Sequence, residues 1–334
     1  MTTQRLSLLL LLPLLLASPA WAVTRFVSNS GLDTNSCSAS QNINTPKKNL
    51  RGLSGALRCM GSGDTLYIRE GTYVEHIVSV AGGDPNITFE MPSGGGSWAT
   101  ATTIAGYPGD ARPVLRAPHD GHQATLRLHS SLNHSWILFD RLDLDGDNWG
   151  KVYFSGTGLT GIQHVRLSNS IVHNSPNTCI GGGGTDVQFL NNEVHHCPTS
   201  VTGSGYGWYV PCTGCLWENN YLHDVGGYGI HEYETSIPSG LDNNIIRNNR
   251  FVNIGASGGS NYAIIMAHGH NNQAYNNLIY NSGFGIQFGW DSTAMKVYNN
   301  TIVNNTGAGI GMLEFHPGDG FIRNNIVYNP RSRG

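Results

Sequence analysis

Charged residues are scarce in this sequence. Asp, Glu, Lys and Arg make up 12% of the 334 residues, the formal net charge is −3, and lysine occurs only at positions 47, 48, 151 and 296. With 19 Lys and Arg against 22 Asp and Glu, the chain is not basic enough to indicate a nucleic-acid partner. No long stretch carries a 3.6-residue apolar period, so a helical fold is not expected. Beyond the first residues, no run approaches the roughly 20 apolar residues of a membrane span.

The N-terminal residues have the features of an export signal. Arg5 precedes a leucine-rich run from Leu8 to Leu16, and Ala20-Trp-Ala22 is typical of a signal-peptidase cleavage site. We therefore interpret residues 1–22 as a secretory signal peptide. The protein is expected to be secreted or periplasmic.

Six cysteines in an exported chain indicate disulfides. Cys37 and Cys59 lie in the N-terminal region and are expected to pair. The other four lie in successive repeats, where stacking can bring them together. The motif Cys212-Thr-Gly-Cys215 has the spacing of zinc knuckles and redox motifs, but it lacks a second such motif and a βαβ context. A structural disulfide is the preferred interpretation.

A repeat of 20-odd residues runs through most of the chain. Its pattern is an apolar residue, any residue, Asn-Asn, any residue and a second apolar residue, as in "CLWENNYLHD" (215–224) and "KVYNNTIVN" (296–304). The predicted apolar anchors recur once per repeat, at Leu142, Ile171, Val194, Leu222, Phe251, Ile279, Ile302 and Val327.

A second column follows in the later repeats: "YGIHEY" (228–233), "YAIIMA" (262–267), "FGIQFG" (284–289) and "AGIGML" (308–313). Short strands separated by Gly and Asn turns predict the coils of an all-β parallel β-solenoid. Asn side chains at equivalent turns are expected to form a hydrogen-bonded ladder along its axis.

These repeats resemble the right-handed parallel β-helix of the pectate lyase superfamily. The resemblance covers residues 64–329 and implies a carbohydrate-active protein with a polysaccharide or oligosaccharide substrate. Residues 23–63 are expected to form an N-terminal cap, in which Asn49–Met60 carries Leu50, Leu53, Leu57 and Met60 at helical spacing and predicts a short capping helix. Residues 330–334 are expected to form a C-terminal tail, and the uncapped edge before them is a possible site of oligomerisation.

The stretch "GYGIHEYETS" (227–236) concentrates titratable groups in a chain that has few of them. If Ile230 faces the core, alternation along the strand turns His231 and Tyr233 outward, whereas Glu232 points inward or ends the strand. Aligned coils then form one outward row of Tyr209, His231, Ile265, Gln287 and Gly311. A second row follows, of Glu234, His268, Trp290 and Glu314, with Asp291 beside it. Aromatic rings mixed with imidazoles and carboxylates are typical of a glycan site, although such groups can also be ordinary surface residues.

The resemblance implies a polysaccharide lyase that cleaves a uronic-acid-containing glycan by β-elimination. Such a reaction needs a base at C5, a proton donor for the leaving oxygen, and a partner for the carboxylate. We assign His268, oriented by Glu234, as the base, with His231 as its rival. Tyr233 is then the proton donor, and Arg247 or Arg250 pairs with the uronate.

Two other classes stay open. A glycoside hydrolase on a neutral glycan needs two carboxylates about 5 to 9.5 Å apart, and Glu232 with Glu234, or Asp291 with Glu314, are candidate pairs. A non-catalytic solenoid that binds a glycan or a metal needs only the repeats.

Two metal sites are considered. Asp143, Asp145 and Asp147 in "LDLDGDNWG" (142–150) supply oxygens at alternate positions, as Ca²⁺ loops do. A column after the Asn pairs offers histidines and an aspartate that can bind a transition metal. The preferred interpretation of that column is a polar turn ladder in which histidine replaces asparagine; its members are His173, His195, His196, His223 and Asp224, followed by Asn253 and Asn281.

Overall fold

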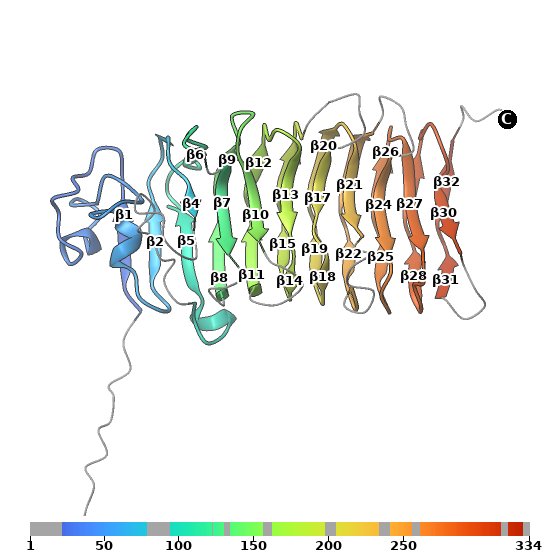
Figure 1. Ribbon diagram of the computed structural model, residues 1–334, viewed down its shortest axis with the longest axis horizontal. Coiled ribbons are helices and arrows are strands. Elements are labelled where there is room, and N and C mark those ends of the chain that lie inside the picture. The colour runs from blue at the N-terminus through green and yellow to red at the C-terminus, as the bar shows by residue number, and fades with distance from the viewer. Residues whose placement is uncertain are drawn as a thin grey trace, which may run out of the picture.

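The chain winds into stacked coils, each of which contributes strands to three parallel β-sheets (Figure 1). The computed structural model describes residues 22–78, 94–121, 123–129, 134–155, 162–197, 205–233, 241–255, 261–314 and 320–329. Coils follow one another along the long axis from the blue N-terminal end to the red C-terminal end. This arrangement is a parallel β-helix, as the repeats predict.

The first sheet has 13 strands among the described residues. Its main path runs through β1 (Thr24–Val27), β2 (Thr65–Ile68), β5 (Thr102–Gly106), β8 (His134–Asp140), β11 (Ile162–Ser168), β15 (Gln188–Leu190), β19 (Leu216–Glu218), β22 (Ile245–Arg247), β25 (Gln273–Tyr275), β28 (Met295–Tyr298) and β31 (Gly320–Arg323). Two short strands join it from the side, β14 (Gly184–Thr185) and β18 (Cys212–Thr213).

The ten-stranded sheet follows the first sheet within each coil. Its strands are β3 (Thr72–Tyr73), β6 (Val114–Arg116), β9 (Asp143–Asp145), β12 (Ile171–His173), β16 (Glu193–His195), β20 (Tyr221–Val225), β23 (Arg250–Ile254), β26 (Leu278–Tyr280), β29 (Thr301–Val303) and β32 (Ile326–Tyr328).

The nine-stranded sheet completes the coil. Its strands are β4 (Ile77–Val78), β7 (Ala124–His129), β10 (Lys151–Ser155), β13 (Thr178–Gly182), β17 (Tyr206–Tyr209), β21 (Tyr228–Glu232), β24 (Tyr262–Ala267), β27 (Phe284–Gly289) and β30 (Ile310–Leu313). In several strands of this sheet a small residue precedes an isoleucine, as Gly229 precedes Ile230. The small residue is needed for close packing, because a Cβ on Gly229 would lie 2.3 Å from the Ala263 carbonyl oxygen of the next coil.

The Asn-Asn pairs form the turn between the first sheet and the ten-stranded sheet. The first Asn adopts left-handed backbone geometry, as at Asn219 and Asn248, both with φ of 57°, which Asn tolerates better than most residues. The second is buried, and its side-chain oxygen accepts hydrogen bonds from the preceding coil. The predicted ladder is confirmed, running through Asn192, Asn220, Asn249, Asn277, Asn300 and Asn325.

Two of the predicted apolar anchors are in the wrong register. Strand pairing aligns Leu144, Val172 and Val194 in one buried row, so the anchors are Leu144 rather than Leu142 and Val172 rather than Ile171. These two repeats are the degenerate copies, in which one or both Asn residues are missing. Without the Asn-Asn pair, the position of the turn could be predicted from the sequence only to within one or two residues.

The predicted N-terminal capping helix is wrong. Residues 49–60 contain only one 3-10 turn, η2 (Ala56–Cys59), besides η1 (Ala39–Gln41) and η3 (Trp98–Thr100) elsewhere. Leu50 and Leu57 are buried, but Leu53 is 79% exposed, and Gly52 has a φ of 87° that no right-handed helix accommodates. In addition, β1 pairs in parallel with β2, so the first sheet begins inside the predicted cap region, before residue 64.

All six cysteines form disulfides. Cys37 pairs with Cys59, as predicted, and the other bridges are Cys179–Cys197 and Cys212–Cys215. The short Cys212–Cys215 bridge confirms that this motif is structural. Three disulfides fit an oxidising compartment. The predicted signal peptide lies outside the described residues except for Ala22, and no helix in the described ranges has the length and hydropathy of a membrane span.

The last described coil exposes its apolar side chains. Val327 is 47% exposed, whereas the equivalent core residues of the two preceding coils, Ile302 and Ile279, are each 0% exposed. Oligomerisation through this edge stays a prediction.

Candidate functional site

The outer face of the nine-stranded sheet carries the predicted row of side chains. Strand register places His231 opposite Ile265, Ile265 opposite Gln287 and Gln287 opposite Gly311. Tyr209 lies one coil earlier, with its ring stacked on His231 at a centroid distance of 5.1 Å. The predicted outward row is therefore confirmed, although Ile265 and Gln287 are largely buried, with 3% and 6% exposure.

Tyrosine rings surround His231. The rings of Tyr206, Tyr228 and Tyr233 lie 5.1, 4.7 and 5.5 Å from it, measured between centroids. Burial lowers the pKa of His231 to about 4, and its Nδ1 has no hydrogen-bond partner. The imidazole is therefore neutral near pH 7.

A second group of rings lies where the strands of this sheet end. Tyr233 stands 5.3 Å from His268 and 5.6 Å from Trp290. His268 and Trp290 occupy equivalent turn positions in consecutive coils, both in left-handed geometry with φ of 62° and 50°, and the His268 amide donates to the Trp290 carbonyl at 3.2 Å. Both ring nitrogens of His268 are buried without a hydrogen-bond partner. We call His231, Tyr233, His268 and Trp290, with Tyr206, Tyr209 and Tyr228, the aromatic face.

The predicted second row is found in part. Glu314 continues the row of His268 and Trp290. It has a φ of 53°, and the carbonyl of Leu313 just before it accepts a hydrogen bond from the Trp290 amide. Glu314 and Asp291 are exposed. Glu234 lies outside the described residues, and its predicted role in orienting His268 stays a prediction.

Glu232 points into the core and is excluded from the aromatic face. It is 0% exposed, and its Oε1 accepts a hydrogen bond from the amide of Asn244 and a longer one from Asn272, at 3.5 Å. Burial raises the pKa of Glu232 well above its usual value, against the opposing effect of the Asn244 hydrogen bond. The predicted hydrolase pair of Glu232 with Glu234 is therefore wrong, because a core carboxyl cannot face a sugar.

Replacing Glu232 by glutamine is expected to flatten the dependence of stability on pH. The raised pKa means that the folded state keeps a proton that the unfolded chain loses above about pH 4.5. Stability from this group is thus complete below that pH and declines as pH rises through the folded-state pKa, by at most about 1.4 kcal/mol per pH unit. Glutamine keeps the acceptor for Asn244 without the ionisation.

The measurement is the free energy of unfolding by urea between pH 5 and pH 9, with Glu70→Gln, at the exposed residue Glu70, as the control. Equal pH slopes for wild type and Glu232→Gln would contradict the raised pKa.

Arg247 and Arg250 do not join the aromatic face. Arg247 ends β22 on the first sheet, where its Nε and Nη2 donate to the two oxygens of Glu218, each at 2.9 Å. Arg250 begins β23 on the ten-stranded sheet and lies 4.8 Å over the ring of Tyr221. The prediction that either residue pairs with a uronate beside His231 is wrong, because neither arginine lies on the nine-stranded sheet that carries His231.

The three aspartates of 143–147 each contact a basic or imidazole side chain. Asp143 accepts from His173 Nε2 at 2.7 Å, Asp145 accepts from Arg116 Nε at 2.9 Å, and Asp147 lies 3.1 Å from His119 Nε2. Each carboxylate therefore has its own partner in the protein, and a Ca²⁺ site at these residues stays a prediction.

Sequence reasoning missed part of the site. Tyr206 and Tyr228 stack at 5.5 Å in a row that continues through Tyr262 and Phe284. The signal was present, because an aromatic residue precedes the small residue of the second repeat column in each of these coils. Two cations on the same sheet were also missed: Lys151 lies 4.9 Å and Arg127 5.7 Å from the Tyr153 ring.

Comparison with known proteins agrees with this architecture. Residues 183–334 match a family model described as a right handed beta helix region. No curated protein sequence matches the chain. The expected resemblance to right-handed parallel β-helix proteins is therefore confirmed by the family match together with the three parallel sheets.

Solved structures with a similar fold include several carbohydrate-active proteins. They include pectate lyase Pel9A (TM-score 0.48, 15% identity, 92% of this chain and 80% of that one) and an alginate lyase from Paenibacillus sp. str. FPU-7 (0.47, 14%, 82% and 93%). A structure described as a glycoside hydrolase has a TM-score of 0.49 and 9% identity over 91% of this chain and 97% of that one. These likenesses carry no argument about function, which has to be argued from the site itself.

Proposed function

We propose that this protein is an exported carbohydrate-active β-helix protein that binds a uronic-acid polymer along the nine-stranded sheet and cleaves it by β-elimination. The observation that carries the proposal is the aromatic face, on which tyrosine and tryptophan rings pack around two imidazoles with unpartnered nitrogens. Aromatic rings stack on sugar faces, and free imidazole nitrogens can accept or donate the protons of the reaction.

His268 is the preferred base. A general base works best when its pKa lies near the operating pH, and the pKa of His231, about 4, is far below neutrality. His231 is better suited to binding the sugar as a neutral hydrogen-bonding group. Tyr233, whose ring lies between the two imidazoles, is within reach of both and is assigned as the proton donor.

Substrate contacts extend along the sheet. Trp290 and Tyr209 would stack on sugar rings at either side of His231, while Gln287, Asp291 and Glu314 would hydrogen-bond hydroxyl groups. Arg127 lies in the same row as Tyr209, because strand register pairs Arg127 with Tyr153, Tyr153 with Gly181 and Gly181 with Tyr209.

The cations favour a polymer over a single sugar. Arg127 and Lys151 lie at least three coils from His231, which at about 4.8 Å per coil is too far to hold the reacting carboxylate. They would bind the carboxylate of another uronate of the same chain. Strands β13 to β30 of this sheet contain no lysine or arginine, so neutral donors would hold the reacting carboxylate.

A second candidate function is hydrolysis of a neutral glycan. Asp291 and Glu314 are exposed carboxylates in turns of consecutive coils, a spacing compatible with the roughly 5 to 9.5 Å between the two carboxyl groups of glycosidases. Strands β13 to β30 of this sheet contain no lysine or arginine, which is consistent with a neutral sugar beside His268.

The products distinguish the candidates. On a panel of polyuronates and neutral polysaccharides, we expect new reducing ends together with the ultraviolet absorbance of an unsaturated uronide, because elimination leaves a double bond conjugated with the carboxylate. Reducing ends without that absorbance would replace elimination by hydrolysis. Binding without either product would leave a non-catalytic glycan-binding protein.

A further inference from the structure

The histidine column that follows the Asn pairs separates into two columns in the structure. His196 and Asp224 occupy turn positions with φ of 50° and 52°, equivalent to Asn253 and Asn281 at 57° and 54°. For these residues the turn-ladder interpretation is right, and Asn253 donates to Asp224 at 3.0 Å. The remaining histidines are not turn residues.

His173, His195 and His223 lie on the outer face of three consecutive strands of the ten-stranded sheet, β12, β16 and β20. Strand register pairs His173 with His195 and His195 with His223. Their rings stack at centroid distances of 5.0 and 4.8 Å, with interplanar angles of 14° and 17°.

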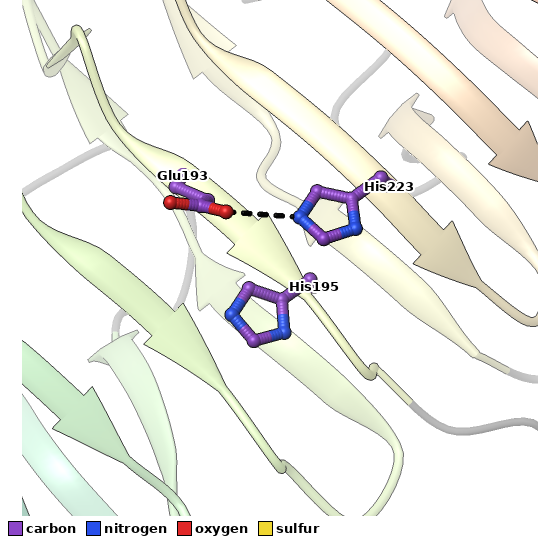
Figure 2. Close-up of side chains that lie close together, drawn as sticks. All are labelled: Glu193, His195 and His223. Carbon is purple, nitrogen blue, oxygen red and sulfur yellow. Dashed lines mark hydrogen bonds and ion pairs between the residues drawn. The ribbon is translucent and has the colours of Figure 1, made fainter.

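The carboxylate of Glu193 lies close to the imidazoles of His195 and His223. Glu193 and His195 lie on β16 and His223 on β20, with both imidazoles and the carboxylate on the same side of the sheet (Figure 2). Ligand atoms of the three residues all lie within 4.8 Å of one another, and Glu193 Oε1 is 3.0 Å from His223 Nε2. Bonds of about 2.0–2.2 Å to a tetrahedral ion separate its ligand atoms by roughly 3.3 Å, so small side-chain rotations suffice to close the site.

A second carboxylate orients His223. Its Nδ1 lies 2.8 Å from Asp224 Oδ2, which holds the ring with Nε2 directed at Glu193. A metal-binding histidine usually has its other ring nitrogen bound to a carboxylate in this way. His173 is arranged differently, because its Nε2 is already bound to Asp143 at 2.7 Å.

We propose that Glu193, His195 and His223 bind one divalent transition-metal ion, Zn²⁺ or Cu²⁺, on the outer face of the ten-stranded sheet. Two imidazoles and one carboxylate are a ligand set that suits these ions and not Ca²⁺ or Mg²⁺, which prefer oxygen ligands alone. Three protein ligands leave a coordination position open to solvent or to a small ligand, and the Glu193 side chain is 42% exposed. This face is not the aromatic face, so the proposal does not depend on the proposed glycan activity.

Isothermal titration of the chelator-treated, untagged protein with ZnCl₂ and with CuCl₂ tests the proposal. We expect one site per chain with a dissociation constant in the micromolar range or tighter, and no saturable binding of CaCl₂ or MgCl₂. Glu193→Gln, His195→Gln and His223→Gln should each weaken binding at least tenfold, and Asp224→Asn by about 10–100-fold through loss of ring orientation. His119→Gln, at the exposed imidazole on the turn after β6, is the control and should bind as wild type does.

Cu²⁺ electron paramagnetic resonance adds a readout that does not depend on affinity. Splitting from two equivalent imidazole nitrogens is expected in the wild type and from one in His195→Gln or His223→Gln. Thermal unfolding without metal verifies that each variant is folded. The proposal is overturned if neither ion binds the folded wild type, or if the affinity survives in the Glu193, His195 and His223 variants.

Discussion

Replacing His268 by alanine is expected to lower kcat on the polymer that the product assay identifies by roughly 10²–10⁴-fold, the usual contribution of a general base. His268 is suited to this role because both of its ring nitrogens lack a protein partner, while Tyr233 and Trp290 pack around its position in the turn after β24. Substrate affinity should change little, since the aromatic rings remain.

Two further variants separate the roles within the aromatic face. Tyr233→Phe keeps the ring contacts with both imidazoles but removes the hydroxyl, so it should lower kcat with little change in KM. His231→Ala should chiefly raise KM, because we assign His231 to sugar binding. The control is His119→Ala, at an exposed imidazole in the turn between β6 and β7. Full activity in His268→Ala would remove His268 from the reaction, and a loss equal to that of His119→Ala would mean that the effect is not specific to the site.

Replacing Asn249 by alanine is expected to lower the free energy of unfolding by about 2–6 kcal/mol, because at least two buried backbone groups lose their partners at roughly 1–3 kcal/mol each. The Asn249 oxygen accepts from the backbone amide of Asn220 at 2.9 Å, and its Nδ2 donates to the Trp217 carbonyl at 3.0 Å. Alanine can replace neither bond. Asn277 should also lose a hydrogen bond, because its side-chain oxygen accepts from Asn249 Nδ2 at 3.1 Å.

Asn248→Gly is the matched control for the ladder. Asn248 is the exposed first member of the same pair and has a φ of 57°, which glycine adopts readily. Its effect on the free energy of unfolding should stay within about 1 kcal/mol. Urea unfolding followed by tryptophan fluorescence measures both variants. Similar stabilities for Asn249→Ala and Asn248→Gly would show that the buried ladder is not a main source of stability.

The proposed glycan site and the proposed metal site lie on different faces of the molecule. The aromatic face lies on the nine-stranded sheet and the metal site on the ten-stranded sheet, so variants of one are expected to leave the other unchanged. Lyase activity that survives in Glu193→Gln, together with metal binding that survives in His268→Ala, would agree with this separation.

The sequence by itself determined the fold and much of the outward row on the nine-stranded sheet. A coil is a local pattern: the Asn-Asn pair specifies the turn, and alternation within the strand specifies which side chains face outward. The row from Tyr209 through His231 to Gln287 could therefore be aligned without coordinates. Where the pair is missing, as before Ile171, the register was predicted one residue away.

Only the tertiary structure decided which faces the remaining residues share. Arg247 and Arg250 are three positions apart, but the turn at Asn248–Asn249 sends them to different sheets. His195 and His196 are neighbours in sequence, yet one ends a strand and the other turns left-handed, so only His195 can join His223 across the coils. The inward direction of Glu232 depended on the buried amides of Asn244 and Asn272 beside it. For the arginines and the histidines the physical reason is the same: the bend at each turn sets the direction of the next strand, and a one-residue shift there moves a side chain to another face.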